Sequence, residues 1–233
     1  MLVLLRPPPF RYSLPLERPY GQVEPVHRAT TGPRTSPRRP ASFAYDWLCP
    51  GSHEGVTTSA SPRKIGRAQN ISRMCLVCGR DNAFGLHARF YELAPDEAAD
   101  AGAELVGIFT PREEHQSYPG RLHGGVSSAI LDETIGRAIL LRQPDTWGVT
   151  VEFSVRFRRP LPLDEDVRCV ARITRDTSRL FEGSGEILLP GGEVAVEATG
   201  KYIKQTLGDI TTKDFAEREW FADPRDLPAN VEL

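Results

Sequence analysis

The sequence predicts an α+β fold in which one long buried helix is wrapped by a curved antiparallel sheet of five or six strands. The segment from His123 to Leu141 has apolar residues around most of its helical circumference, and a helix of that kind is normally buried. Strand-like segments flank it, with short connections such as Pro190-Gly191-Gly192. Short connections favour antiparallel neighbours. No internal repeat follows residue 74.

The expected strands are short apolar runs with a period of two, bounded by turn residues. They are residues 86–93, 104–110, 149–158, 165–175, 180–189 and 193–204. In the third run the valines and phenylalanines from Val149 to Phe157 share one face, because side chains alternate along a strand. We therefore expect Thr150 on the opposite face from Val149 and Val151.

The chain divides by composition into a leader, a domain and a tail. Residues 1–73 hold 11 of the 20 prolines and 11 basic residues against 4 acidic ones, whereas the remainder holds 18 basic against 27 acidic. Residues 1–73 show no periodicity, so we expect a disordered leader. Because Met74 is the only internal methionine, translation starting there, with the leader as a gene-model artefact, is a hypothesis. We expect a domain at 74–205 and a tail at 206–233 with a short docking helix from Lys213 to Phe221.

Several classes of function are disfavoured. The arginines of the leader are scattered among prolines, which argues against a nucleic-acid-binding arm. Its longest apolar run, Leu2 to Leu5, is too short for a membrane span or an export signal. Four cysteines without an export signal indicate free thiols. We expect a cytoplasmic protein with no nucleic-acid or membrane partner.

The start of the predicted helix, His123-Gly124-Gly125, is a candidate oxyanion site. Unpaired N–H groups and the positive end of the helix dipole favour negative charge there, and glycines let a ligand approach the backbone. Such donors stabilise the oxyanion that forms when a carbonyl is attacked. The alternative is that the glycines only permit a tight turn.

Two adjacent acids in the helix, Asp132 and Glu133, compete as candidate base or nucleophile. Glu133 precedes Arg137 by four residues, which is the favourable order for an ion pair. Asp132 lacks a helical cation, and a carboxylate in an apolar helix without a structural partner is a site candidate. The alternative for Asp132 is a carboxylate satisfied by hydroxyls or by a second subunit. The Thr150 hydroxyl could orient water or the carboxylate.

Two other clusters have possible ligand roles. Cys75 and Cys78 suggest zinc, for which His87 and His115 are the nearest further ligands; the absence of a second Cys-x-x-Cys favours a buried turn instead. His115 itself is expected to be solvated. Arg156, Arg158 and Arg159 could meet phosphate groups or form a solvated strand end.

Taken together, these segments resemble the PaaI-like family of hotdog-fold acyl-CoA thioesterases. The resemblance covers residues 75 to 205 and rests on four motifs. They are Cys75-Leu76-Val77-Cys78-Gly79 with Asn82 and Gly85-Leu86, Pro119-Gly120-Arg121-Leu122-His123-Gly124-Gly125, Leu131-Asp132-Glu133 with Gly136, and Phe157-Arg158-Arg159-Pro160.

The resemblance implies roles for individual residues. The acid nine residues after the motif histidine, Asp132, would be the catalytic carboxylate, with Glu133 as the other candidate. The backbone oxyanion donor would be Gly124 or Gly125, and Thr150 would be the assisting hydroxyl. His123 would contribute positioning near the thioester. Gln116 is a possible stand-in for an upstream amide found in some members.

The resemblance also implies a homodimer, or a dimer of dimers forming a homotetramer, with two helices side by side and each site built by both chains. We therefore expect an acyl-CoA hydrolase that needs no cofactor, since CoA is part of the substrate. A non-catalytic acyl-CoA binding or sensing protein is the main alternative, because fold does not fix function. An enoyl-CoA hydratase is a further one, poorly matched by the spacing of His123 and Asp132.

Overall fold

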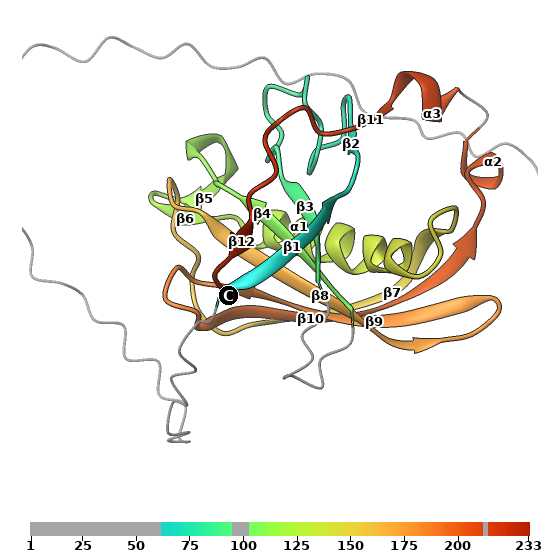
Figure 1. Cartoon of the computed structure of the whole chain (residues 1–233). Helices are drawn as coiled ribbons and strands as arrows, with labels where there is room; N and C mark the ends of the chain where they lie inside the picture. The colour runs from blue at the N-terminus through green and yellow to red at the C-terminus, as the bar shows by residue number, and fades with distance from the viewer. Residues whose placement is uncertain (1–61, 95–102, 212–213) are drawn as a thin grey trace, which may run out of the picture. The chain divides into compact units, whose positions relative to one another are not determined.

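The computed structural model describes residues 62–94, 103–211 and 214–233 (Figure 1). These residues lie in one compact unit, Glu54–Leu233. The predicted leader up to residue 61 lies outside the described residues, as does Lys213 of the predicted tail helix.

The main element is an eight-stranded antiparallel sheet with the strand order β12-β1-β3-β4-β8-β9-β10-β7. Its strands are β1 (Arg63–Ala68), β3 (Arg89–Leu93), β4 (Glu104–Phe109), β7 (Trp147–Phe157), β8 (Val167–Asp176), β9 (Leu180–Leu188), β10 (Val194–Gln205) and β12 (Asn230–Val231). Four shorter strands form two small pairs: β2 (Ile71–Ser72) with β11 (Trp220–Phe221), and β5 (Gln116–Tyr118) with β6 (Arg121–Leu122).

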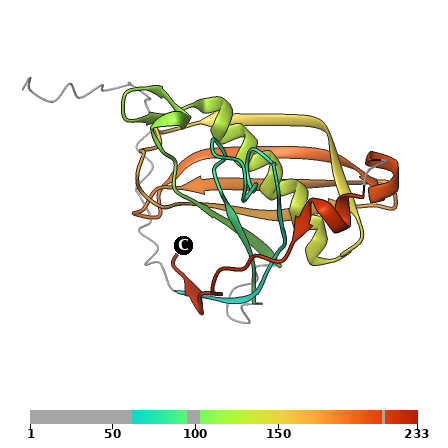
Figure 2. The same cartoon turned by 90° about the horizontal axis from the view of Figure 1, so that it is seen from above.

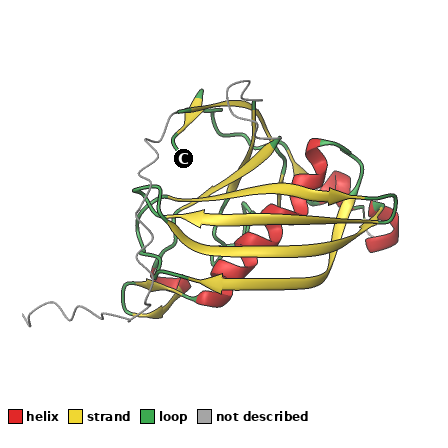
Figure 3. Ribbon diagram, turned by 90° about the horizontal axis from the view of Figure 1, so that it is seen from below, coloured by secondary structure: helices red, strands yellow, loops and turns green. Residues whose placement is uncertain are grey.

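One long helix, α1 (Gly124–Arg137), continues directly into the 3-10 turn η2 (Ala138–Leu141). Figure 1 shows α1 on the inner side of the curved sheet, and Figures 2 and 3 show that it runs obliquely to the strands. The remaining helical segments are single turns: η1 (Glu113–His115), α2 (Leu207–Ile210) and α3 (Phe215–Arg218). No helix within the described ranges is long and apolar enough to cross a bilayer.

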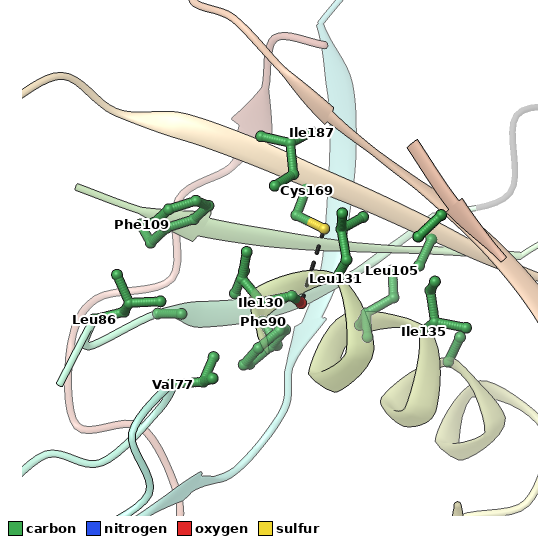
Figure 4. Packing of buried hydrophobic residues seen from close by; sticks show 14 of the residues in the cluster. Val77, Leu86, Phe90, Leu105, Phe109, Ile130, Leu131, Ile135, Cys169 and Ile187 are labelled. Atoms are coloured by element: carbon green, nitrogen blue, oxygen red, sulfur yellow. Dashed lines mark hydrogen bonds between the residues drawn. The ribbon is translucent and has the colours of Figure 1, made fainter. Parts of the chain in front are cut away.

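Glycines of β9 let the helix approach the sheet closely. A Cβ added at Gly183 would lie 2.6 Å from Ile135 Cγ2, and one at Gly185 would lie 3.1 Å from Ile135 Cγ1. Ile135 therefore fills the space that side chains at these two positions would need. Figure 4 shows the apolar core around α1. Its fully buried members include Ile130, Leu131, Ile135, Phe90, Leu105, Cys169 and Ile187.

The predicted helix and all six predicted strands are present, so the expected α+β architecture is confirmed. The sheet has eight strands and not five or six, because β1 and β12 also join it. Five of the predicted strands shift at their ends by one or two residues, and two elements differ by more. The third strand of the sheet begins at Arg89 and not at residue 86, because His87 has a left-handed backbone with φ of 51°. The tail helix is only the single turn α3, and Trp220 and Phe221 instead form β11.

The predicted domain start at residue 74 is too late. Strand β1 pairs with β3 on one side and with the C-terminal β12 on the other, so residues 63–72 belong to the folded unit. A chain that began at Met74 would lack β1 and β2. The partner of β1 that closes this end of the sheet lies more than 150 residues away, and a local sequence pattern does not reveal such a pairing.

The prediction that the valines and phenylalanines of β7 share one face along the whole strand was wrong for its first residues. Lys201 pairs with Glu152, but the next residue, Tyr202, pairs with Thr150. Val151 is therefore the extra residue of a β-bulge, which reverses the alternation of faces. As a result, Thr150 points to the same side of the sheet as α1.

Candidate active site

Asp132 lies in the middle of α1, on the side that meets β7 and β10. Its Oδ1 accepts a hydrogen bond from Thr150 Oγ1 at 2.9 Å and another from the Tyr202 hydroxyl at 3.1 Å. The residue is partly exposed and lines a cavity of about 110 Å³. The other lining residues are Glu133, Gly136, Arg137, Leu140, Thr146, Trp147, Gly148, Thr150 and Tyr202. Asp132 thus reaches an open cavity, with hydroxyl partners in place of a cation.

The two hydroxyls reach Asp132 from neighbouring strands. Thr150 is turned toward the helix by the bulge at Val151, and Tyr202 lies opposite it on β10. The Tyr202 ring is buried and stacks on Phe181, with ring centroids 4.9 Å apart. Burial and the nearby Asp132 carboxylate raise the pKa of Tyr202, so the phenol remains a neutral donor. Sequence reasoning missed Tyr202, because a tyrosine in an apolar strand is indistinguishable from a core residue.

Glu133 borders the same cavity, rotated by about 100° from Asp132 around the helix, but its carboxylate is held in an ion pair. Its Oε1 accepts from Arg137 Nε at 2.8 Å, which confirms the predicted ion pair. The Arg137 side chain is 6% exposed, and it also donates to Cys78 Sγ at 3.0 Å and to the Asn70 carbonyl at 2.8 Å. Glu133 therefore has the structural role that the sequence suggested for it.

The N-terminus of α1 is capped by His123. Its Nδ1 accepts from the Gly125 N–H at 2.8 Å, so in a neutral ring Nε2 carries the proton. This cap uses the Gly125 N–H, one of the two predicted oxyanion donors. Gly124 is the first residue of the helix, and its N–H has no hydrogen-bond partner among the described residues. A Cβ added at Gly124 would lie 3.3 Å from the Phe157 ring.

The helix separates these two predicted parts of the site. Gly124 and Asp132 are eight residues apart on α1, which places them about 12 Å apart along the axis. One substrate carbonyl cannot meet both groups of the same chain, because a hydrogen-bond donor acts at roughly 3 Å.

Gln116 lies near the N-terminal end of α1 and not near Asp132 of the same chain. It lies in β5, next to His115, whose carbonyl accepts from the His123 N–H at 2.9 Å. Figure 1 shows the β5–β6 hairpin at that end of α1. Gln116 is therefore grouped with His123 and not with Asp132 of the same chain.

The three arginines at the end of β7 do not line the cavity beside Asp132. Arg158 makes a two-bond ion pair with Glu197, at 2.9 and 2.8 Å, and Arg156 Nε lies 3.6 Å from the same carboxylate. Arg159 Nη2 lies 3.3 Å from Glu193. Because Glu197 adjoins the buried Val196 and Ala198 on β10, Arg156 and Glu197 face away from α1.

The zinc set considered from the sequence is not assembled. The metal-capable group found among the described residues is Cys75, Cys78 and Glu133, without either histidine. His115 is 4% exposed, so the expectation of a solvated side chain was wrong. Its Nδ1 accepts from the Arg112 N–H and its Nε2 lies 3.0 Å from the Phe84 carbonyl. The buried His115 side chain therefore connects the backbone near Arg112 to that near Phe84.

A protein-family model described as "Thioesterase superfamily" matches residues 119–196, from just before α1 into β10. Residues 119–196 are thus similar to this superfamily, and the long helix packed against a curved antiparallel sheet is the arrangement of the hotdog fold.

The chain is also similar to individual proteins and to a solved structure. The chain is 29% identical over 105 residues to acyl-coenzyme A thioesterase 13 of Homo sapiens, which covers 45% of this chain and 70% of that protein. It is 28% identical over 108 residues to an uncharacterized protein of Schizosaccharomyces pombe, with 45% and 62% covered. A crystal structure of a thioesterase superfamily protein is 27% identical with a TM-score of 0.48, covering 56% of this chain and 60% of that one.

Proposed function

We propose that this protein hydrolyses acyl-CoA thioesters to the free acid and CoA. Two similarities support this class of reaction: the match of residues 119–196 to the thioesterase superfamily model, and the similarity to acyl-coenzyme A thioesterase 13. The observation that carries the proposal is the carboxylate of Asp132, which is held by two hydroxyls at the edge of a cavity and has no cation partner among the described side chains. A carboxylate in that setting keeps its negative charge free for chemistry.

The active site in this proposal is built by two copies of the chain. Asp132 and Gly124 of one chain are about 12 Å apart on the helix, so an antiparallel α1 from a partner would bring the partner's N-terminus to Asp132. The edge of the sheet supports such pairing. Strand β7 is 11 residues long, is the last strand of the sheet, and exposes Val149, Val151 and Phe157. An exposed apolar edge strand is a template for pairing with another chain.

The chemistry follows from the groups in this composite site. The Thr150 and Tyr202 hydroxyls fix Oδ1 of Asp132, which directs Oδ2 to the reaction. Asp132 either takes a proton from the attacking water or attacks the carbonyl itself to form an anhydride that water opens. In both routes the carbonyl oxygen becomes an oxyanion, which the Gly124 N–H at the helix N-terminus stabilises. The carbon–sulfur bond then breaks and CoA leaves as its thiolate.

The groups at the N-terminal end of α1 have supporting roles. His123, with its proton on Nε2, and Gln116 are positioned to orient the thioester near Gly124. Arg156, Arg158 and Arg159 are the candidates for the phosphates of CoA. To bind a phosphate, their guanidinium groups would either contact it while still paired with Glu197 and Glu193 or leave these ion pairs.

A panel of acyl-CoAs of differing chain length and ring content tests the proposal. The wild-type chain should release free CoA from at least one member of the panel, and the preferred member defines the acyl group. Isothermal titration with the same panel measures binding separately. Tight binding without CoA release would favour the alternative, a non-catalytic acyl-CoA binding protein.

A further inference from the structure

The turn formed by Cys75 and Cys78 brings two thiols together next to α1. The Gly79 N–H donates to the Cys75 carbonyl at 2.9 Å and closes the turn. The two sulfur atoms and a carboxylate oxygen of Glu133 all lie within 4.8 Å of one another. A Cβ added at Gly79 would lie 2.3 Å from the Cys75 carbonyl oxygen, so a glycine is needed for this compact turn.

The two thiols differ in their access to solvent. Cys78 is 1% exposed, whereas Cys75 is partly exposed between Met74 and Leu76, each of which is 49% exposed. An accessible thiol followed by a buried one matches the two roles in disulfide chemistry, because the first thiolate attacks the oxidant and the second sulfur then attacks the oxidised first one.

The surroundings favour a thiolate in this pair. The Cys78 Sγ accepts from Arg137 Nη2 at 3.0 Å and from the Ser72 N–H at 3.4 Å, and the Cys75 Sγ accepts from the Val77 N–H at 3.3 Å. Hydrogen bonding from the Cys78 thiol lowers the pKa of Cys75 to about 7, against the opposing effects of burial and Glu133. The same shared proton and burial raise the pKa of Cys78. At neutral pH the pair therefore holds a single negative charge for part of the time.

The surroundings of this cluster suit thiol chemistry better than metal binding. The guanidinium of Arg137 already bridges Cys78 and Glu133, at 3.0 and 2.8 Å. It supplies the positive charge that these groups need and occupies the space between them. A cation bound by the two sulfurs and the carboxylate would have to displace this buried side chain, which also stacks on Phe90 and Trp220.

We propose that Cys75 and Cys78 form a reactive dithiol that is oxidised to a disulfide by hydroperoxides. The Cys75 thiolate attacks the peroxide oxygen and becomes a sulfenic acid, and with hydrogen peroxide one water leaves. The Cys78 sulfur then attacks the Cys75 sulfur, the S–S bond forms and a second water leaves. The two sulfurs together lose two electrons, and the peroxide gains them. This chemistry is separate from thioester hydrolysis and goes beyond the proposed function.

The test uses the full chain carrying Cys49→Ser, so that Cys75, Cys78 and Cys169 are the only thiols. After treatment with hydrogen peroxide, peptide mapping should find Cys75 linked to Cys78, with a mass lower by about 2 Da that dithiothreitol restores. Cys169 is the internal control, because burial raises its pKa to about 12 and it should stay reduced in the folded protein. Both thiols remaining reduced, or oxidising no faster than Cys169, would overturn the proposal.

Two further measurements separate the dithiol from its alternatives. The rate of Cys75 alkylation by iodoacetamide should rise as the pH passes about 7, because the lowered pKa makes the thiolate available above that value. With Cys78→Ser, oxidised glutathione should trap a mixed disulfide at Cys75 that the chain with both thiols resolves. A stoichiometric zinc ion that blocks alkylation and is lost in Cys75→Ser would instead show a metal site.

Discussion

Two adjacent carboxylates on α1 border one cavity, and their surroundings differ in kind. Asp132 meets the hydroxyls of Thr150 and Tyr202. Glu133, rotated by about 100° around the helix, meets the buried guanidinium of Arg137 and lies near the thiols of Cys75 and Cys78. The ion pair neutralises Glu133, whereas the hydroxyls orient Asp132 without neutralising it. The difference shows how neighbouring positions of one helix can hold one acid in an ion pair and leave the other without a cation.

The largest expected effect is at Asp132. Asp132→Asn keeps the shape and the hydrogen-bonding oxygen but removes the charge, so acyl-CoA turnover should fall by about 10²- to 10⁴-fold. The free energy of unfolding should change little, since the residue is partly exposed. Steady-state CoA release and urea denaturation measure the two quantities. Near-normal turnover would remove Asp132 from the chemistry.

The next effect is at the start of the helix. Gly124 is the first helical residue and His123 before it is extended, so proline is compatible with this backbone; it removes the N–H and adds its ring carbons. Gly124→Pro should reduce kcat by about 10²-fold or more. Gly124→Ala is the matched control, because it adds a Cβ against Phe157 and keeps the N–H. An equal loss in both variants would mean that crowding, and not the donor, is responsible.

A smaller effect is expected at Thr150. Thr150→Val removes one of the two donors to Asp132 Oδ1, and the loss of one such hydrogen bond should cost roughly tenfold in kcat/KM. Thr150→Ser retains the hydroxyl and should recover most of the activity. Should valine behave like wild type, the hydroxyl has no part in orienting the carboxylate.

The smallest effect on turnover is expected at Glu133. Glu133→Gln leaves the guanidinium of Arg137 buried without its carboxylate partner, so the protein should lose about 1–3 kcal/mol of unfolding free energy. Turnover should stay within about threefold of wild type, since the Glu133 carboxylate is already held by Arg137. A loss of turnover matching that of Asp132→Asn, at normal stability, would reverse the roles of the two acids.

The helix and the ion pair of Glu133 with Arg137 could be predicted from the sequence, because both depend on local spacing. The apolar circumference of residues 123–141 indicated burial, and the i,i+4 spacing identified the Glu133–Arg137 pair. These features need no knowledge of distant contacts.

The partners from other strands could not be predicted in this way. Tyr202 lies 70 residues from Asp132, and Thr150 reaches it only because a bulge shifts the register of β7 by one residue. The prediction that Asp132 lacks a cation partner holds among the described side chains, and its Oδ1 is hydrogen-bonded by two hydroxyls, which was the alternative that the sequence left open. Likewise, the role of β1 depends on pairing with the C-terminus, and the use of the Gly125 N–H depends on the orientation of the His123 ring.

The central claim, that each active site joins Asp132 of one chain to Gly124 of another, is tested most directly by mixing two inactive variants. Asp132→Asn and Gly124→Pro chains are purified separately and refolded together in equal amounts. A mixed dimer then holds one site in which Asp132 and Gly124 are both intact. If half of the dimers are mixed, activity should recover to roughly a quarter of wild type. Activity that stays at the level of the separate variants would contradict a site shared between chains.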